Sequence, residues 1–231
     1  MRVVLFLLLA LNFIFADSFE LVKALFTDKN FSQNKLKGEL AKHKASEFYI
    51  AENFELSFDM LGKNDEHDII AMHAVSSARD DAFIDLYVYA KSDGIYAMRS
   101  LAMTGMMLDM VKNYDKVPED LKAGIDIENY KLVISSDKNL LEFANANVDK
   151  FEKIYELEKS GKDYESELKD LHFNAVEKDE VFSLIVGGMV DNVVGFMRVQ
   201  SDSELPKMHP SKYIMIKQIL PKSKWYLFKT T

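Results

Sequence analysis

The chain has 231 residues, 48% of them hydrophobic, with a formal net charge of −8 and no cysteine. A chain of this length can bury about 70% of the surface that it exposes when unfolded, which is enough for a core without covalent cross-links. The absence of cysteine excludes a disulfide framework and a lipid-modified cysteine, and the acidic total argues against a nucleic-acid-binding protein.

Residues 1–16 have the order of a secretory signal peptide. Arg2 is followed by an apolar run, and the stretch ends in the small residue Ala16. As a helix, residues 3–15 would rise only about 20 Å, too little for a hydrocarbon core of about 30 Å. We therefore expect cleavage before Asp17. The mature chain is then expected to be a soluble bacterial protein, periplasmic or secreted, with no stable membrane span after signal removal.

The first part of the mature chain has a helical pattern. From residue 45 to residue 61, apolar residues recur at spacings of three and four, and Gly62 follows where a left-handed helix cap is expected. Asn64 is then expected to cap a second helix, which turns Ile69 and Met72 inward.

The next segment is ambiguous. The sequence FIDLYVYA, residues 83–90, is rich in β-branched and aromatic residues and alternates almost as well as it follows a helical period. Strand and helix therefore both stay open for residues 83–103. A helix is predicted from Ile95 to about Tyr114, which ends before Pro118 because proline disrupts a helix interior.

The clearest helix covers about residues 136–159. Its apolar residues form one stripe, and the opposite face is charged. The stripe consists of Leu140, Ala144, Val148, Phe151 and Tyr155. Ser160 and Gly161 end this helix, and a short polar helix to about Leu171 is expected to follow.

After Asp179 the apolar period changes to two, which predicts strands. In VFSLIVGGMVDNVVGFMRVQ we expect a β-hairpin that turns at Asp191 and Asn192 and sets Gly187 opposite Phe196. The segments YIMIKQIL and WYLFKTT, connected by PKSK, predict a second hairpin.

These elements predict an α+β fold in a single domain over residues 17–231. A mostly helical N-terminal part, about 17–172, is expected to pack on a C-terminal four-stranded antiparallel β-sheet built from two hairpins, a β-meander over about 180–231. No linker rich in Pro, Gly or Ser separates the two parts, so we expect one shared core.

The densest group of hard metal ligands consists of Asp65, His67, Asp68 and His73. Two histidines that chelate from one helical face need a spacing of three or four, whereas these two are six positions apart. An exposed acidic helix start explains the group better. We expect no metal and no cofactor.

One further group contains the residue types of a Ser-His-Asp catalytic site. On a helix, His73, Ser76, Ser77 and Asp80 would share one face, but a nucleophile needs a strained, exposed setting and an oxyanion hole. The motifs G-x-S-x-G, H-E-x-x-H and G-x-G-x-x-G are absent from the sequence. Catalytic residues therefore stay unknown, and a non-enzyme is favoured.

Four methionines, Met103, Met106, Met107 and Met110, lie at spacings of three and four. On one helix their thioethers could converge on Cu(I), the soft ion that such ligands select. Apolar neighbours such as Leu108 surround them, and unbranched Met commonly fills gaps in cores. Core packing is the favoured interpretation, ahead of a Met-based Cu(I)-handling protein.

The end of the chain is basic and aromatic. Residues 206–231 contain no Asp or Glu and six lysines, at positions 207, 212, 217, 222, 224 and 229. The aromatic residues among them are Tyr213, Trp225, Tyr226 and Phe228. Such a hairpin could bind an anionic polymer or lipid headgroups. The favoured alternative is that the lysines protect a sheet edge and balance the acidic helices.

We therefore expect an exported, non-catalytic binding or interaction module. It would act through the concave junction of sheet and helices or through the terminal hairpin, on an unknown protein or an anionic surface ligand. Nucleic acid is not an expected partner. The alternative is an exported hydrolase-type enzyme with carboxylates and a His assembled across the fold.

Overall fold

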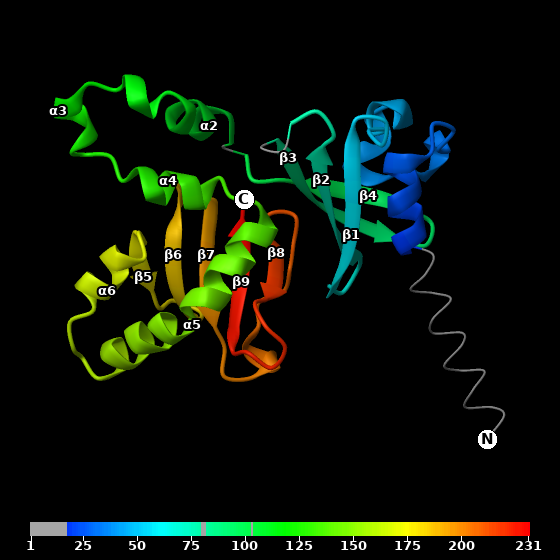
Figure 1. The fold of residues 1–231 in the computed structure, drawn as a ribbon. Helices are drawn as coiled ribbons and strands as arrows, with labels where there is room; N and C mark the ends of the chain where they lie inside the picture. Colours follow the sequence, from blue (N-terminus) through cyan, green and yellow to red (C-terminus); the bar gives the residue numbers. More distant parts are fainter. Residues whose placement is uncertain (1–17, 80–81, 103) are drawn as a thin grey trace. The chain divides into compact units, whose positions relative to one another are not determined.

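The structure, a computed structural model, describes residues 18–79, 82–102 and 104–231. The chain divides into two compact units. The first unit contains the residues up to Ser100 together with Met208–Pro210, and the second unit contains residues 101–207 and 211–231. Each unit has its own antiparallel sheet (Figure 1).

The first unit is built around a four-stranded sheet. Residues 18–27 form a helix, and three short 3-10 helices follow, η1 (Gln33–Lys35), η2 (Gly38–Lys42) and η3 (Ala45–Glu47). The strands are β1 (Phe54–Lys63), β2 (Asp68–Ser76), β3 (Phe83–Lys91) and β4 (Gly94–Arg99). Their order across the sheet is the order along the chain, so each strand pairs with the next.

One face of this sheet shares a core with the helix of residues 18–27. Successive side chains of a strand point to opposite faces, so alternate residues of β2 enter the same core. The buried residues are Ile70, Met72 and Ala74 from β2 and Val22, Leu25 and Phe26 from the helix. The other face of the sheet carries the odd-numbered residues of β2, among them His73.

The second unit begins with the helices. They are α2 (Thr104–Lys112), η4 (Tyr114–Lys116), α3 (Glu119–Lys122), α4 (Ile127–Val133), α5 (Asp137–Lys159) and α6 (Glu165–Asp170). Helix α5 is capped at both ends. The Ser136 hydroxyl accepts the N–H of Asn139, and Gly161, with a φ of 67°, closes the last turn in the left-handed conformation that glycine tolerates best.

The sheet of the second unit has five strands. They are β5 (Ala175–Glu177), β6 (Phe182–Met189), β7 (Asn192–Arg198), β8 (Tyr213–Gln218) and β9 (Trp225–Thr230), with η5 (Asp202–Glu204) between β7 and β8. The order is β5-β6-β7-β9-β8, so β5 and β8 are the edge strands. Helix α5 lies across this sheet (Figure 1) and packs Phe151 against Phe196 and Trp225, with ring centroids 5.0 and 5.3 Å apart.

The predicted fold class is wrong. The residues expected to form a helical part, about 17–172, contain a complete four-stranded sheet at 54–99, and the helices of the second unit lie mostly in the middle of the chain. The C-terminal sheet has five strands instead of four, because β5 adds to the edge of β6.

The error in the first unit has a physical cause. Phe54 and Phe58 are four positions apart, which is one helical turn but also two repeats of a strand, and the structure uses the strand repeat. Asn64 does not cap a helix. Its side-chain oxygen accepts the N–H groups of Glu66 and His67, which closes the turn between β1 and β2.

The open question about residues 83–103 is settled in favour of strands for its first part, since β3 and β4 cover residues 83–91 and 94–99. The helix predicted from Ile95 to Tyr114 is therefore wrong over β4, and its later part corresponds to α2. The predicted helices over about 136–159 and up to about Leu171 are confirmed as α5 and α6.

Both C-terminal hairpins are confirmed, but the register predicted for the first is wrong. Met189 pairs with Asn192, so the turn lies one position earlier than expected, and Val190 takes a positive φ of 53°. Phe196 faces Leu184 instead of Gly187, because the earlier turn moves its partner by two positions and the bulge between Ile185 and Gly187 moves it by one more.

Candidate functional site

Helix α6 and the edge strand β5 belong to the second unit (Figure 1). Residues of both elements line a groove with a volume of about 460 Å³. We call it the α6–β5 groove. Its apolar lining comes from Tyr164 and Leu168 on the α6 side and from Phe173 and Val176 on the β5 side. Leu168 and Phe173 are buried and continue into the core, so the groove has a fixed apolar floor.

The rim of the groove is polar and mostly acidic. Asp163, Glu165 and Lys169 line it. Glu165 and Lys169 are 3.8 Å apart but 76% and 80% exposed, so water screens their ion pair. Among the described residues, two carboxylates and one ammonium group therefore line the opening.

The turn from α6 into β5 shapes the floor of the groove. The N–H groups of His172 and Phe173 bond to the carbonyl oxygens of Lys169 and Leu168. This is the Schellman arrangement of a helix end, in which His172 occupies the left-handed position with a φ of 58°. Glycine is the usual residue there, so we expect the histidine side chain to have a structural or functional role that offsets the backbone strain.

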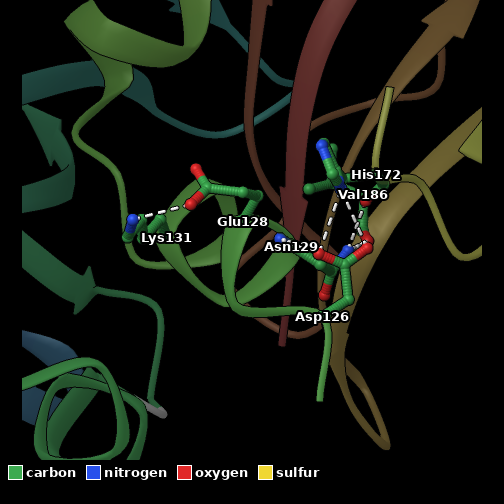
Figure 2. Close-up of polar contacts among 6 residues, drawn as sticks. All are labelled: Asp126, Glu128, Asn129, Lys131, His172 and Val186. Carbon is green, nitrogen blue, oxygen red and sulfur yellow. Dashed lines mark hydrogen bonds and ion pairs between the residues drawn. The ribbon is translucent and has the colours of Figure 1, made fainter. Parts of the chain in front are cut away.

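The partner of His172 is Asp126, the residue before α4 (Figure 2). Nδ1 of His172 lies 3.0 Å from both carboxylate oxygens of Asp126. The same carboxylate accepts the N–H of Asn129 and caps α4. Burial by itself would raise the pKa of Asp126, but the hydrogen bonds from His172 and from the Asn129 backbone outweigh it, and the pKa is lowered.

Asn129 joins α4 to the turn before β5 and to strand β6 (Figure 2). Its side-chain amide, in a residue only 8% exposed, donates to the carbonyl oxygen of His172 at 2.6 Å and to that of Val186 at 2.5 Å. Val186 is the extra residue of the β6 bulge, so its carbonyl needs a partner outside the ladder. One buried amide thus satisfies two carbonyl groups that lie outside regular structure.

Gly187 allows this close approach. A Cβ at that position would lie 2.8 Å from Val133 Cγ2 and 3.2 Å from Asn129 Oδ1.

Glu128 and Lys131, also drawn in Figure 2, form a half-exposed pair at 2.7 Å on the outer face of α4. That pair contributes little to the stability of the junction.

The first unit contains a different polar arrangement, on the sheet face opposite its core. Ser57 of β1 pairs with His73 of β2, and His73 pairs with Asp85 of β3. Nδ1 of His73 lies 2.5 Å from a carboxylate oxygen of Asp85, whose side chain is 8% exposed. No hydrogen bond is found from Ser57, which is exposed, to His73 in the described part of the chain.

The group of predicted hard ligands is not a helix start. Asp65 and His67 lie in the turn between β1 and β2, and Asp68 begins β2. Asp68 is buried, accepts a hydrogen bond from Ser18 at 2.6 Å and pairs with Lys63 at 2.9 Å. Among the residues that the structure describes, no group of three or more His, Asp or Glu could hold a metal ion.

His67 is nevertheless unusual. Its Nε2 is buried and has no hydrogen-bond partner among the described residues, and its ring packs against Tyr96, with centroids 5.1 Å apart. Burial lowers the pKa of His67, and Lys91 and His209 lower it further. A small polar cavity of about 220 Å³ adjoins it at the turn end of this sheet.

The second predicted group does not share one face. His73 and Ser76 both lie on β2, three positions apart, so they point to opposite faces of the sheet. Ser77 lies in the following turn, and Asp80 is outside the described residues.

The methionine cluster is only partly described. Met107 is 6% exposed, which fits core packing, and Met110 is half-buried. Met103 and the side chain of Met106 are outside the described part. A thioether site for Cu(I) therefore stays a hypothesis.

The basic C-terminal hairpin differs from the surface that its sequence suggested. Trp225, Tyr226 and Phe228 are buried, so their rings belong to the core. Lys229 is also buried and pairs with Asp137 at 2.7 Å, and Lys212 pairs with Glu180 on the surface at 2.7 Å.

Sequence reasoning did not find the junction of Asp126, Asn129 and His172, because its residues come from separate segments and form no local motif.

Among the described helices, none is long and apolar enough to cross a membrane. Comparisons with protein-family models, with curated proteins and with solved structures gave no match.

Proposed function

We propose that the chain is an exported binding module and that its ligand occupies the α6–β5 groove. The observation that carries this proposal is the combination of an open apolar floor, formed by Leu168 and Phe173, with a charged rim. Binding sites typically combine an apolar concavity with a few polar groups that orient the ligand. The buried amide of Asn129 donates to the carbonyl oxygen of His172, the residue before Phe173, and so helps to fix the backbone next to the floor.

The groove can be tested by filling it. Ala175 is half-buried on the lining, so Ala175→Trp places a ring in the groove, and Ala146→Trp places the same ring on the exposed surface of α5 as the control. The probe is a random peptide library displayed on phage, selected against the full chain. Selected peptides are expected to bind Ala175→Trp at least about tenfold more weakly than the wild type, the effect of one lost contact cluster.

Equal binding to the wild type and to Ala175→Trp, or a selection that yields no binder, would overturn the proposal. Both variants must first show the thermal unfolding midpoint of the wild type within about 3 °C, so that a loss of binding reports the groove and not the fold.

Export is proposed from the pattern of residues 1–16, namely one cation, an apolar run and a final Ala. The test is the mass of the protein recovered after expression in a bacterial host with its own N-terminus. A chain that begins at Asp17 and lies in the periplasm or medium supports the proposal. A full-length chain in the cytoplasm would contradict it.

A second candidate function is an exported hydrolase. The observation that favours it is the row of Ser57, His73 and Asp85 on three adjacent strands, in which Asp85 already orients the imidazole. The test is labelling with a fluorophosphonate, followed by mass spectrometry of the peptide that contains Ser57. Label on Ser57 that disappears in His73→Ala would support this candidate, and no label would remove it.

A further inference from the structure

We propose that the ligand of the α6–β5 groove is an extended peptide that adds to β5 as a sixth strand and carries cationic side chains between apolar ones. This inference rests on the function proposed above and specifies its ligand. Three features of the described residues support it: the open edge of β5, the apolar floor and the acidic rim.

The open edge supplies backbone hydrogen bonds. β5 is the first strand of the order β5-β6-β7-β9-β8, and in the described part of the chain no strand pairs with its outer edge. Alternate residues of an edge strand direct their N–H and C=O groups away from the neighbouring strand. An incoming chain can pair with them and gain affinity that does not depend on its side chains.

The apolar floor supplies contacts for alternate side chains. Val176 of β5 and Leu168 of α6 line opposite sides of the groove, so every second side chain of an added strand would point between them. Aliphatic residues of moderate size fit a volume of about 460 Å³ shared among several side chains.

The rim determines the charge of the partner. Among the described residues that line the groove, two carboxylates, of Asp163 and Glu165, stand against one ammonium, of Lys169, so the rim has an excess of negative charge. Lys153 and Lys178 pair with the carboxylates of Glu167 and Glu158, which do not line the groove. Lysine or arginine at alternate positions of the peptide is therefore the complementary pattern.

The test uses fluorescein-labelled hexapeptides and fluorescence anisotropy with the full chain. Lys-Val-Lys-Val-Lys-Val is expected to bind, and Glu-Val-Glu-Val-Glu-Val is not. Asp163→Asn and Glu165→Gln are each expected to weaken the first peptide about two- to fivefold, the range of an exposed ion pair. Glu142→Gln, an exposed carboxylate on α5, is the control and is expected to change nothing.

Backbone methylation tests strand addition separately from charge. One version of the cationic peptide carries N-methyl groups on its valines and another carries them on its lysines. Only one set of N–H groups faces β5 in an added strand, so one version is expected to lose at least about tenfold in affinity and the other to keep most of it. Equal affinities of the two versions would overturn strand addition.

The remaining outcomes separate this inference from the function on which it rests. Library peptides that bind Ala175→Trp more weakly than the wild type, and yet are acidic or tolerate both methylation patterns, would support the groove as a binding site and would overturn the inference. If no library peptide binds Ala175→Trp more weakly than the wild type, both the proposed function and this inference are overturned. A dimer in sedimentation that Ala175→Trp disrupts would make a second copy of the chain the occupant and would also overturn the inference.

Discussion

Asp126 and His172 are 46 positions apart, yet the carboxylate of Asp126 holds the ring of His172 through both of its oxygens at 3.0 Å. The pair connects the start of α4 to the turn that leads from α6 into β5. It also explains why a histidine occupies a left-handed position at which helices usually place glycine. The groove proposed as the binding site thus begins at a turn that is fixed by a long-range contact.

This relationship predicts a specific order of stabilities at position 172. His172→Gly removes the backbone strain, and the pair that it loses is 41% and 51% exposed, so the free energy of unfolding is expected to change by less than about 1 kcal/mol. His172→Ala keeps the strain and loses the pair, so it is expected to be about 1 kcal/mol less stable than His172→Gly. Urea unfolding measures both. An alanine variant as stable as the glycine variant would show that the turn is not strained.

Asn129 is expected to matter more than His172. Asn129→Ala leaves the carbonyl oxygens of His172 and Val186 without a donor, so the free energy of unfolding is expected to fall by about 2–4 kcal/mol. Asn147→Ala is the control, because that amide bonds only to the carbonyl oxygen of Phe143 on its own helix. Equal losses in the two variants would contradict the role assigned to Asn129.

The lowered pKa of His67 predicts a pH dependence of stability. Folding favours the neutral ring, so the contribution of His67 is fully present above its unfolded pKa of about 6.5 and is lost as the pH falls below that value. His67→Phe keeps a ring beside Tyr96 but cannot titrate. Urea unfolding between pH 7.5 and 5 is expected to show a smaller decline in stability for this variant. The same decline in both proteins would contradict the prediction.

The parts of the fold that the sequence predicts correctly depend on local signals. Helix α5 has a long apolar stripe, a serine cap and a glycine end within its own sequence, and each of these signals is interpreted without knowledge of the rest of the chain. The two C-terminal hairpins likewise follow from a period of two, and both are present.

The first unit could not be predicted in this way, because spacings of four fit both a helix and a strand. The choice depends on the partners, and here the pairing of β1 with β2 and the helix of residues 18–27 decide it. Part of the register error in the first hairpin has a similar cause, since the bulge at Val186 is stabilised by Asn129 from a distant helix. The rest comes from the turn, which lies one position earlier than expected. The left-handed turn at His172 could not be predicted, because a positive φ is a property of the backbone and is not specified by a histidine in the sequence.

The basic hairpin provides the last prediction. Lys229 was expected on the surface with the other lysines, but its side chain is 4% exposed and its ammonium lies 2.7 Å from Asp137, the first residue of α5. Breaking a buried ion pair leaves one charge without compensation, which typically costs about 3–5 kcal/mol. Lys229→Met is therefore expected to lower the free energy of unfolding by about that amount, whereas Lys224→Met, at an exposed position, is expected to change it by less than about 0.5 kcal/mol.

A second change separates the ion pair from the loss of a long side chain. If the penalty arises from breaking the ion pair, adding Asp137→Leu to Lys229→Met should recover part of the lost stability, because neither position then carries a charge. The recovery should be incomplete, since a carboxylate in the first turn also stabilises a helix by about 0.3–1 kcal/mol. Additive losses in the double variant, measured by urea unfolding, would show that Lys229 acts through packing and not through its charge.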